Sequence, residues 1–154
     1  MVINFKLLTG TAKIPFYNNS TDAGIDFFSD QDHKLHPGEH YAYSTGVAWE
    51  PYFDQRETGA GLNNFYKFYM QIQGRSGLAL RDGIAVLGGV IDQDYRGEIK
   101  IILLNTGNDT VDIFKGMKIA QGIVILTPNV VIKATEFISD TNRGSKGFGS
   151  SSST

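Results

Sequence analysis

Apolar and polar side chains alternate along several segments of the chain with a period of two, the pattern of half-buried β-strands. In residues 68–73, Phe, Met and Ile alternate with Tyr, Gln and Gln. In residues 99–104 the alternate positions are Ile, Ile and Leu, and the other face is largely apolar too. Residues 119–126 and 130–138 are rich in β-branched side chains and are separated by the turn signal Thr-Pro-Asn. We predict a strand in each of these segments.

The spacing of turn residues predicts an all-β protein. Eighteen glycines are scattered among the short apolar runs, and long stretches of strong helix formers are few, which favours a sandwich or barrel. At most one short helix is predicted, over residues 115–121. Residues 50–66 are polar, aromatic and irregular, which predicts a long loop or an insertion. The Gly/Ser-rich end, residues 143–154, predicts a flexible C-terminal arm following one β-barrel domain over residues 1–142.

Composition excludes several classes of function. The net charge of −2 disfavours binding to a nucleic acid polymer or an anionic membrane. The absence of cysteine excludes disulfides, thiolate metal sites and cysteine nucleophiles. Apolar runs stay well below the roughly 20 residues of a membrane span. The stretch Met1 to Leu8 is too short and too polar for a signal peptide, so we expect a cytoplasmic protein.

Four segments concentrate charged side chains and glycine. They are DAGID at 22–26, GRSGLA at 74–79, GVIDQDYRGE at 89–98 and RGSKGFGS at 143–150. Taken singly, each fits a turn, a charged hairpin tip or a disordered tail. Together they supply carboxylates, arginines, hydroxyls and backbone N–H groups. Those groups hold a polyphosphate with a divalent ion and activate a water beside it.

With KIAQ at 118–121 as a fifth segment in the same order, the chain resembles the trimeric dUTPase family from Ile3 to Ser151. The resemblance implies a distorted jelly-roll barrel. It implies hydrolysis of dUTP to dUMP and pyrophosphate, by attack of water on the α-phosphorus, with Mg²⁺ as cofactor. It also implies a homotrimer, in which one subunit gives the hairpin of residues 89–99, a second gives the Arg-Ser motif, and the arm comes from a third or swaps across.

The resemblance also assigns roles within the hairpin. Asp92 is implied to be the general base that deprotonates the attacking water. Tyr95 is implied to pack against the deoxyribose and to leave no room for a 2′-hydroxyl. Backbone groups at Gly89, Val90 and Ile91 are implied to read the uracil edge, so that cytosine meets an unpaired polar contact.

The remaining implied site residues surround the phosphates. Asp26 is implied to reach Mg²⁺ through water, because this ion is held mainly by its substrate. The arm is implied to order only on the nucleotide, at a cost in entropy. The residues implied to contact the phosphates and to stack on the uracil are Arg75, Ser76, Gly77, Gln121, Arg143, Phe148, Gly149 and Ser150.

The sequence departs from the family pattern at three places. Lys118 stands where an arginine is common, which keeps the charge but loses bidentate geometry. Val86 stands where many relatives carry an asparagine, so one side-chain contact must be replaced. The stretch from Thr45 to Arg75 is longer than in typical members, and the extra residues are about 52–65. Such insertions occur in phage-encoded members, some of which act on a repressor protein. An alternative function is therefore regulation of a repressor or another partner through this insertion.

Two further interpretations fit the residues less well. A dCTP deaminase shares the fold, but the DQDY sequence at 92–95 favours the pyrophosphatase. His33, His36 and His40 are spaced as for a helix, but Pro37 and Gly38 interrupt it and no cysteine completes a metal site. We therefore expect these histidines to lie in an exposed loop.

Overall fold

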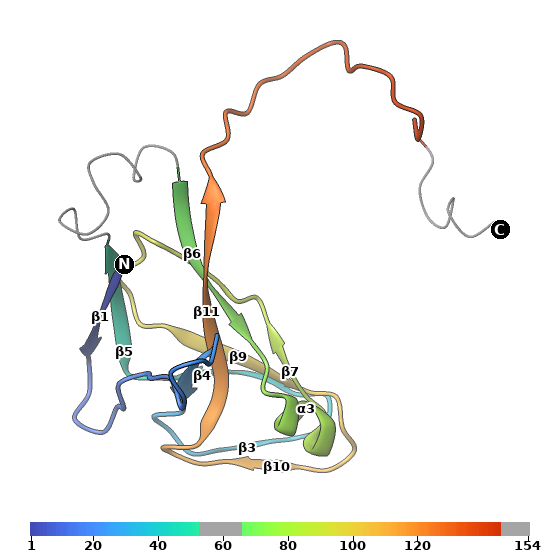
Figure 1. The fold of residues 1–154 in the computed structure, drawn as a ribbon. Coiled ribbons are helices and arrows are strands. Elements are labelled where there is room, and N and C mark those ends of the chain that lie inside the picture. The colour runs from blue at the N-terminus through green and yellow to red at the C-terminus, as the bar shows by residue number, and fades with distance from the viewer. Residues whose placement is uncertain (53–65, 146–154) are drawn as a thin grey trace.

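The computed structural model describes residues 1–52 and 66–145, which form a mostly β body and a long arm that leaves it (Figure 1). The one helix among these residues is α3 (Ser76–Asp82). The strands are β1 (Val2–Leu7), β2 (Ile25–Phe28), β3 (His33–Leu35), β4 (His40–Ser44), β5 (Val47–Tyr52), β6 (Tyr66–Gln73), β7 (Ile84–Leu87), β8 (Val90–Asp92), β9 (Lys100–Asn105), β10 (Val111–Ile113) and β11 (Lys118–Pro128). The predicted all-β class with one short helix is confirmed for this part of the chain.

The strands form four small antiparallel sheets around one core. The largest has the order β2-β11-β6-β8, a second has the order β4-β9-β7, and β1-β5 and β3-β10 make two pairs. Every sheet sends large side chains inward, and burying each of them stabilises the fold by about 1.5–3 kcal/mol. The largest fully buried apolar side chains include Trp49, Tyr43, Phe27, Leu35, Met70, Ile101 and Leu103.

The period of two predicted over residues 68–73 is confirmed in β6. Phe68, Met70 and Ile72 are 7%, 0% and 3% exposed, and the residues between them lie on the opposite, partly exposed face. β6 is paired along its whole length with the part of β11 from Gln121 to Pro128, and both strands pack on the same core. A Cβ atom on Gly122 would lie 2.8 Å from Cε2 of Phe27, so only glycine fits there.

The helix predicted over residues 115–121 is wrong. This segment turns at Gly116, whose φ is +81°, and enters β11 at Lys118. The helix forms instead at residues 76–82, where Leu, Ala and Arg are good helix formers. It ends at Gly83, whose φ is +69° and whose backbone N–H caps the carbonyls of Leu78 and Ala79. Among the described residues, no helix is long and apolar enough to cross a membrane.

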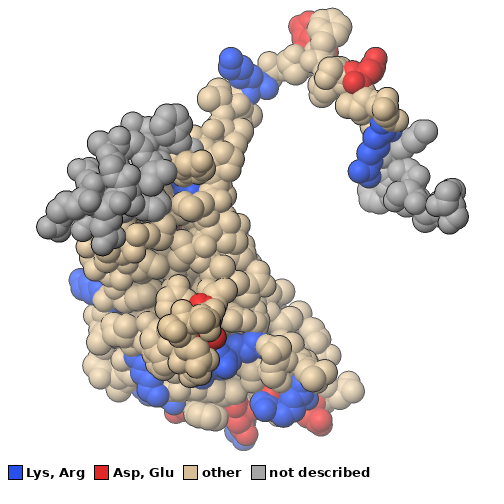
Figure 2. Space-filling model, in the orientation of Figure 1, with Lys and Arg blue, Asp and Glu red and all other residues tan. Residues whose placement is uncertain are grey.

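The strand predicted over residues 130–138 does not form in the single chain. β11 ends at Pro128, and residues 129–145 run away from the body without strand structure (Figures 1 and 2). Val131, Ile132 and Phe137 are 79%, 93% and 86% exposed. β-Branched composition suits a strand, but a strand also needs a partner, and this segment pairs with no strand in the described part of the chain. The division of the chain at residue 142 stays a prediction.

The loop predicted over residues 50–66 lies mostly outside the described residues. Glu50 to Tyr52 belong to β5, paired with β1, and Tyr66 begins β6. The intervening residues 53–65, which hold the predicted insertion, are not described.

Candidate active site

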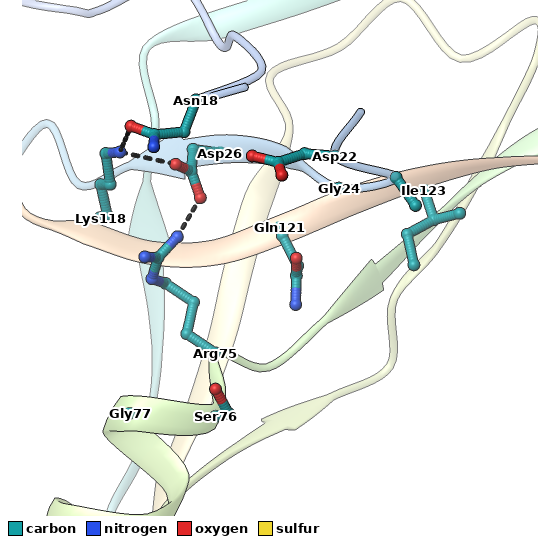
Figure 3. Close-up of a pocket in the computed structure, with 11 residues that line it drawn as sticks. Asn18, Asp22, Gly24, Asp26, Arg75, Ser76, Gly77, Lys118, Gln121 and Ile123 are labelled. Atoms are coloured by element: carbon teal, nitrogen blue, oxygen red, sulfur yellow. Dashed lines mark hydrogen bonds and ion pairs between the residues drawn. The ribbon is translucent and has the colours of Figure 1, made fainter. Parts of the chain in front are cut away.

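Residues of three predicted motifs line one pocket on the outer face of the largest sheet (Figure 3). Its volume is about 470 Å³. The lining residues are Asn18, Asp22, Ala23, Gly24, Asp26, Arg75, Ser76, Gly77, Lys118, Gln121 and Ile123. The structure therefore brings together Asp26, Arg75, Ser76, Gly77 and Gln121, which the sequence had predicted as one phosphate and metal region.

Strand pairing explains why these distant segments meet. Gln121 on β11 lies opposite Asp26 on β2 on one side and opposite Gln73 on β6 on the other. Residues directly opposite each other project to the same face of a sheet. Gly74 and Arg75 follow β6 directly, and α3 starts at the next residue, so the loop from β6 into α3 forms the pocket wall.

Asp26 is the electrostatic centre of the pocket. The residue is only 5% exposed. Nη1 of Arg75 donates a hydrogen bond to its Oδ1, and Nζ of Lys118 lies 2.7 Å from its Oδ2. A carboxylate with so little access to water needs such partners, because its desolvation would otherwise cost several kcal/mol. Each carboxylate oxygen thus carries one cation.

The amide of Gln121 is fixed in the same pocket. Its Nε2 donates to the carbonyl oxygen of Gly74 at 3.1 Å. A Cβ atom on Gly24 would overlap this amide, so the glycine of the first motif leaves it room. Because Nε2 is anchored to the backbone, Oε1 of Gln121 has a defined position at the pocket wall.

The hairpin of residues 84–105 carries the other predicted residues. β7 pairs with β9, and the connection between them contains β8, which pairs with β6 rather than with β9. Ile91 and Ile99, which flank the predicted charged tip, are therefore not paired with each other as the two strands of a simple hairpin would be. Gly89, directly before β8, has a φ of +109°, and a Cβ atom there would lie 2.8 Å from the carbonyl oxygen of Ile72. The backbone at Gly89 therefore lies too close to β6 for any side chain at this position.

Asp92 and Tyr95 are exposed on this hairpin. The hydroxyl of Tyr95 donates to the carbonyl oxygen of Glu98 at 3.0 Å, which fixes the ring beside the turn. Val90, Ile91, Asp92, Tyr95, Glu98 and Lys100 surround a hollow of about 240 Å³. The structure thus groups the predicted general base with the predicted uracil and sugar contacts.

The hairpin and the pocket are far apart within one chain. Asp92 lies opposite Tyr69, and Gln121 lies opposite Gln73, on the two sides of β6. Four residues along a strand and two strand spacings across the sheet put the Cα atoms of Asp92 and Gln121 about 17 Å apart. A single chain does not bring Asp92 into the phosphate pocket.

Of the predicted arm residues only Arg143 is described, and it lies away from both places. Arg143 is exposed on the segment that runs out from β11 (Figure 1). Phe148, Gly149 and Ser150 lie outside the described residues. Their predicted contacts stay predictions.

Sequence reasoning missed the arrangement around Lys118. It gave this lysine no role beyond its charge, and it gave none to Asn18, whose Oδ1 accepts a hydrogen bond from Nζ of Lys118 at 3.2 Å. Asn18 precedes the first motif by four residues, and only the tertiary fold reveals the contact.

The three histidines take separate structural positions. His33 lies in β3, with Nε2 at 2.9 Å from Oε1 of Glu39, and His40 begins β4, so an exposed loop is the wrong description for these two. Nδ1 of His36 lies 3.0 Å from Oγ1 of Thr110. The backbone N–H of His36, followed by the side chain of His33, lowers the pKa of Glu39. Within residues 1–52 and 66–145, no group of three or more His, Cys, Asp or Glu side chains is placed to hold a metal ion.

Comparisons with known proteins show which family this chain resembles. The family model described as dUTPase matches residues 11–152. The deoxyuridine 5'-triphosphate nucleotidohydrolase of Clostridium tetani is 41% identical over 150 residues, covering 96% of this chain and 94% of that protein. The enzyme of the same name from Nautilia profundicola is 40% identical, covering 97% and 98%.

Solved structures share the fold. The dUTPase of Staphylococcus bacteriophage 80alpha with dUpNHpp has a TM-score of 0.82 and 26% identity, covering 97% of this chain and 98% of that one. A mutant dUTPase of phage phi11 of S. aureus, in which a structural Mg(II) ion is coordinated, has a TM-score of 0.77 and 22% identity, covering 91% and 100%. These similarities agree with the predicted distorted jelly-roll barrel.

Proposed function

The chain belongs to the dUTPase family, and from this premise we propose that its active sites form between subunits of a homotrimer, where the Asp26 pocket of one subunit meets the Asp92 hairpin of another. The enzyme is a dUTP diphosphatase, which hydrolyses dUTP to dUMP and pyrophosphate by attack of water at the α-phosphorus. The proposal of a shared site rests on one observation, the separation of Asp92 from Gln121 within one chain.

That separation supports a site shared between subunits. A general base must lie within about 2.6–3.2 Å of the proton it takes, or one water further away. The attacked phosphorus belongs to the same phosphate chain that Arg75 and Gln121 would hold. Asp92 and Gln121 project from the same face of the sheet, with β6 lying between their strands. A second subunit whose hairpin covers the pocket would supply the missing base.

The pocket suits a triphosphate. The planar guanidinium of Arg75 can form two parallel hydrogen bonds to one phosphate, and the hydroxyl of Ser76 and the N–H of Gly77 add neutral donors beside it. Ser76 and Gly77 are exposed toward the pocket at the start of α3. Gln121 would add a hydrogen bond from its fixed amide.

The hairpin suits the nucleoside. Backbone groups of Gly89, Val90 and Ile91 would read the uracil edge, and a water or a backbone group would replace the side-chain contact that Val86 cannot make. Tyr95, held by Glu98, would pack against the deoxyribose. Asp92 at the end of β8 would hold and deprotonate the attacking water.

The residues of the pocket fit a magnesium ion that arrives with the substrate. Mg²⁺ usually keeps several waters and binds substrate phosphates together with one or two carboxylates. Each oxygen of Asp26 is engaged by one cation, and a carboxylate has about four acceptor positions, so Asp26 can also accept from a metal-bound water. Asp22 lines the same pocket. The ion, when bound, would neutralise charge on the phosphoryl oxygens.

The segment after β11 supports a swap in which the C-terminal part of one subunit packs on a neighbouring subunit. Five large apolar side chains, Val130, Val131, Ile132, Phe137 and Ile138, are 68–93% exposed in the single chain. Such a segment is costly in water and would be covered by a neighbouring subunit, adding a strand to one of its sheets. Arg143 and the residues after it would then reach a site on that neighbour, where Arg143, Ser150 and the backbone of Gly149 would clamp the γ-phosphate and Phe148 would stack on the uracil.

Mixing two inactive variants tests the shared site. Arg75→Ala and Asp92→Asn damage opposite halves of the proposed site. If the halves come from different subunits, trimers refolded from an equal mixture regain activity in about a quarter of their sites, because random assembly pairs an intact Arg75 with an intact Asp92 that often. The measurement is pyrophosphate release from dUTP before and after joint refolding.

Each variant refolded alone is the control, since refolding itself must not restore turnover. A mixture that stays as inactive as its components places both residues in one subunit and overturns the proposal.

Replacing Tyr95 with alanine is expected to relax sugar selection. The ring and its hydrogen bond to Glu98 would no longer fill the space at the 2′ position, so turnover of UTP should rise relative to dUTP. The assay compares pyrophosphate release from UTP, dUTP, dCTP and dTTP, with and without Mg²⁺. Tyr95→Phe, which keeps the ring, is the matched variant. Unchanged discrimination in Tyr95→Ala would assign the 2′ position to another residue.

The regulatory alternative stays a prediction. The segment that would bind a repressor or another protein, about residues 52–65, lies almost wholly outside the described residues. The family match favours the pyrophosphatase over both this alternative and a dCTP deaminase.

A further inference from the structure

We propose that Asp26 is the internal counter-anion of the phosphate site, and that the triphosphate takes over its two cations, Arg75 and Lys118, when it binds. The inference rests on the proposed function and extends it, because it makes Lys118 a phosphate-binding cation of the same pocket as Arg75. Asn18 and Phe16 become residues that position this lysine.

The burial of the three charges gives the order in which a ligand meets them. The side chain of Asp26 is 7% exposed, whereas those of Arg75 and Lys118 are 32% and 31% exposed. All three line the same pocket (Figure 3). An anion entering the pocket therefore meets the two cations first, with the carboxylate behind them.

A β-bulge aims Lys118 into the pocket. Lys118 lies opposite Phe28 and Ala120 lies opposite Phe27, so Ile119 is an extra residue in β11. Strict alternation from Gln121 would turn Ile119 to the pocket face and Lys118 to the core. The bulge instead allows Ile119 and Ala120 to be buried together, each 0% exposed, and returns Lys118 to the face of Gln121.

Two neutral contacts hold Lys118 independently of Asp26. Its Nζ donates to Oδ1 of Asn18 at 3.2 Å and lies 5.2 Å from the centre of the Phe16 ring, within the range of a cation–π interaction. The Phe16 ring is itself stacked on Phe28, with centroids 5.5 Å apart. The ammonium group therefore keeps its place when the carboxylate releases it.

Exchange of partners follows from the charges. Without Asp26, two cations would face each other across the pocket and repel, so the carboxylate keeps the empty site neutralised and ordered. A metal-free phosphate anion must compete with this carboxylate for both cations. When magnesium accompanies the triphosphate, the released carboxylate has a new partner in a metal-bound water. Asp26 should consequently oppose binding of a metal-free anion but assist turnover with magnesium.

The test is binding of inorganic pyrophosphate to the full-length protein in EDTA, measured by calorimetry, beside dUTP hydrolysis in Mg²⁺. Asp26→Asn is expected to bind metal-free pyrophosphate about tenfold more tightly than the parent while losing most turnover. Lys118→Met is expected to bind pyrophosphate about tenfold more weakly and to raise KM for dUTP more than it lowers kcat. Binding of deoxyuridine should not change in Lys118→Met, and Lys118→Arg should restore pyrophosphate binding.

Lys115→Met is the matched control, because Nζ of Lys115 contacts Oγ1 of Thr11 outside the pocket and its loss should change none of these values. Weaker pyrophosphate binding in Asp26→Asn would make Asp26 a structural residue and overturn the exchange. Unchanged pyrophosphate binding in Lys118→Met would overturn it as well, whether or not Asp26→Asn folds. If the variants show the expected changes in pyrophosphate affinity but the parent does not hydrolyse dUTP, the proposed function fails and the exchange of partners stands.

Discussion

An Asp92→Asn enzyme is expected to turn over dUTP about 10²- to 10⁴-fold more slowly than the parent, because an amide of nearly the same size cannot take the proton of the attacking water. The fold should be retained, since the side chain of Asp92 is exposed and its strand pairs with β6 through the backbone. The measurement is kcat for pyrophosphate release at saturating dUTP, with the thermal midpoint as a check of folding.

Asp109→Asn provides the control for the change of charge. Asp109 is also exposed but contributes to neither the pocket nor the hairpin hollow, so turnover should stay at the parental value. If Asp92→Asn turns over dUTP within a factor of two of the parent, Asp92 is not the general base.

Local pattern was enough to predict the strands that bury one face. In β6 the alternation of Phe68, Met70 and Ile72 with polar neighbours is visible in six residues, because the face of a side chain in a strand depends only on its position. The helix was predicted at the wrong place because Gly77, a poor helix former, interrupts the short stretch of helix formers in residues 76–82. The strand over residues 130–138 was wrong because β-branched residues form a strand only when they pair with another one, and this segment pairs with none in the described part of the chain.

The site was predictable as a set of residues but not as an arrangement. The order of five motifs identified Asp26, Arg75 and Gln121, whereas their meeting depends on β11 pairing with both β2 and β6, which joins segments far apart in sequence. The bulge at Ile119 has no sequence signal of its own, and it decides that Lys118 faces Asp26. Because β8 and β11 pair with opposite sides of β6, Asp92 also lies away from the pocket. The sequence of the motifs does not show this separation.

Deleting residues 143–154 is expected to abolish most turnover while leaving the proposed trimer and the thermal midpoint of unfolding nearly unchanged. The described part of this segment, residues 143–145, is exposed and adds nothing to the core. The exposed apolar side chains of residues 130–138 remain in the truncated protein and can still pack on a neighbour. Loss of a clamp on the γ-phosphate should misplace the α-phosphorus, and misplacement of about 1 Å can cost 10²-fold in rate.

Deleting only residues 152–154 is the matched control, because it shortens the arm without touching Arg143, Phe148, Gly149 or Ser150, and parental turnover is expected. Full turnover in the protein that lacks residues 143–154 would make the arm a solvated tail with no part in the site. Joint refolding with full-length Asp92→Asn then shows where the arm acts. Activity returns if the arm of one subunit serves a site whose Asp92 belongs to another, whereas a mixture that stays inactive assigns the arm and Asp92 to the same chain.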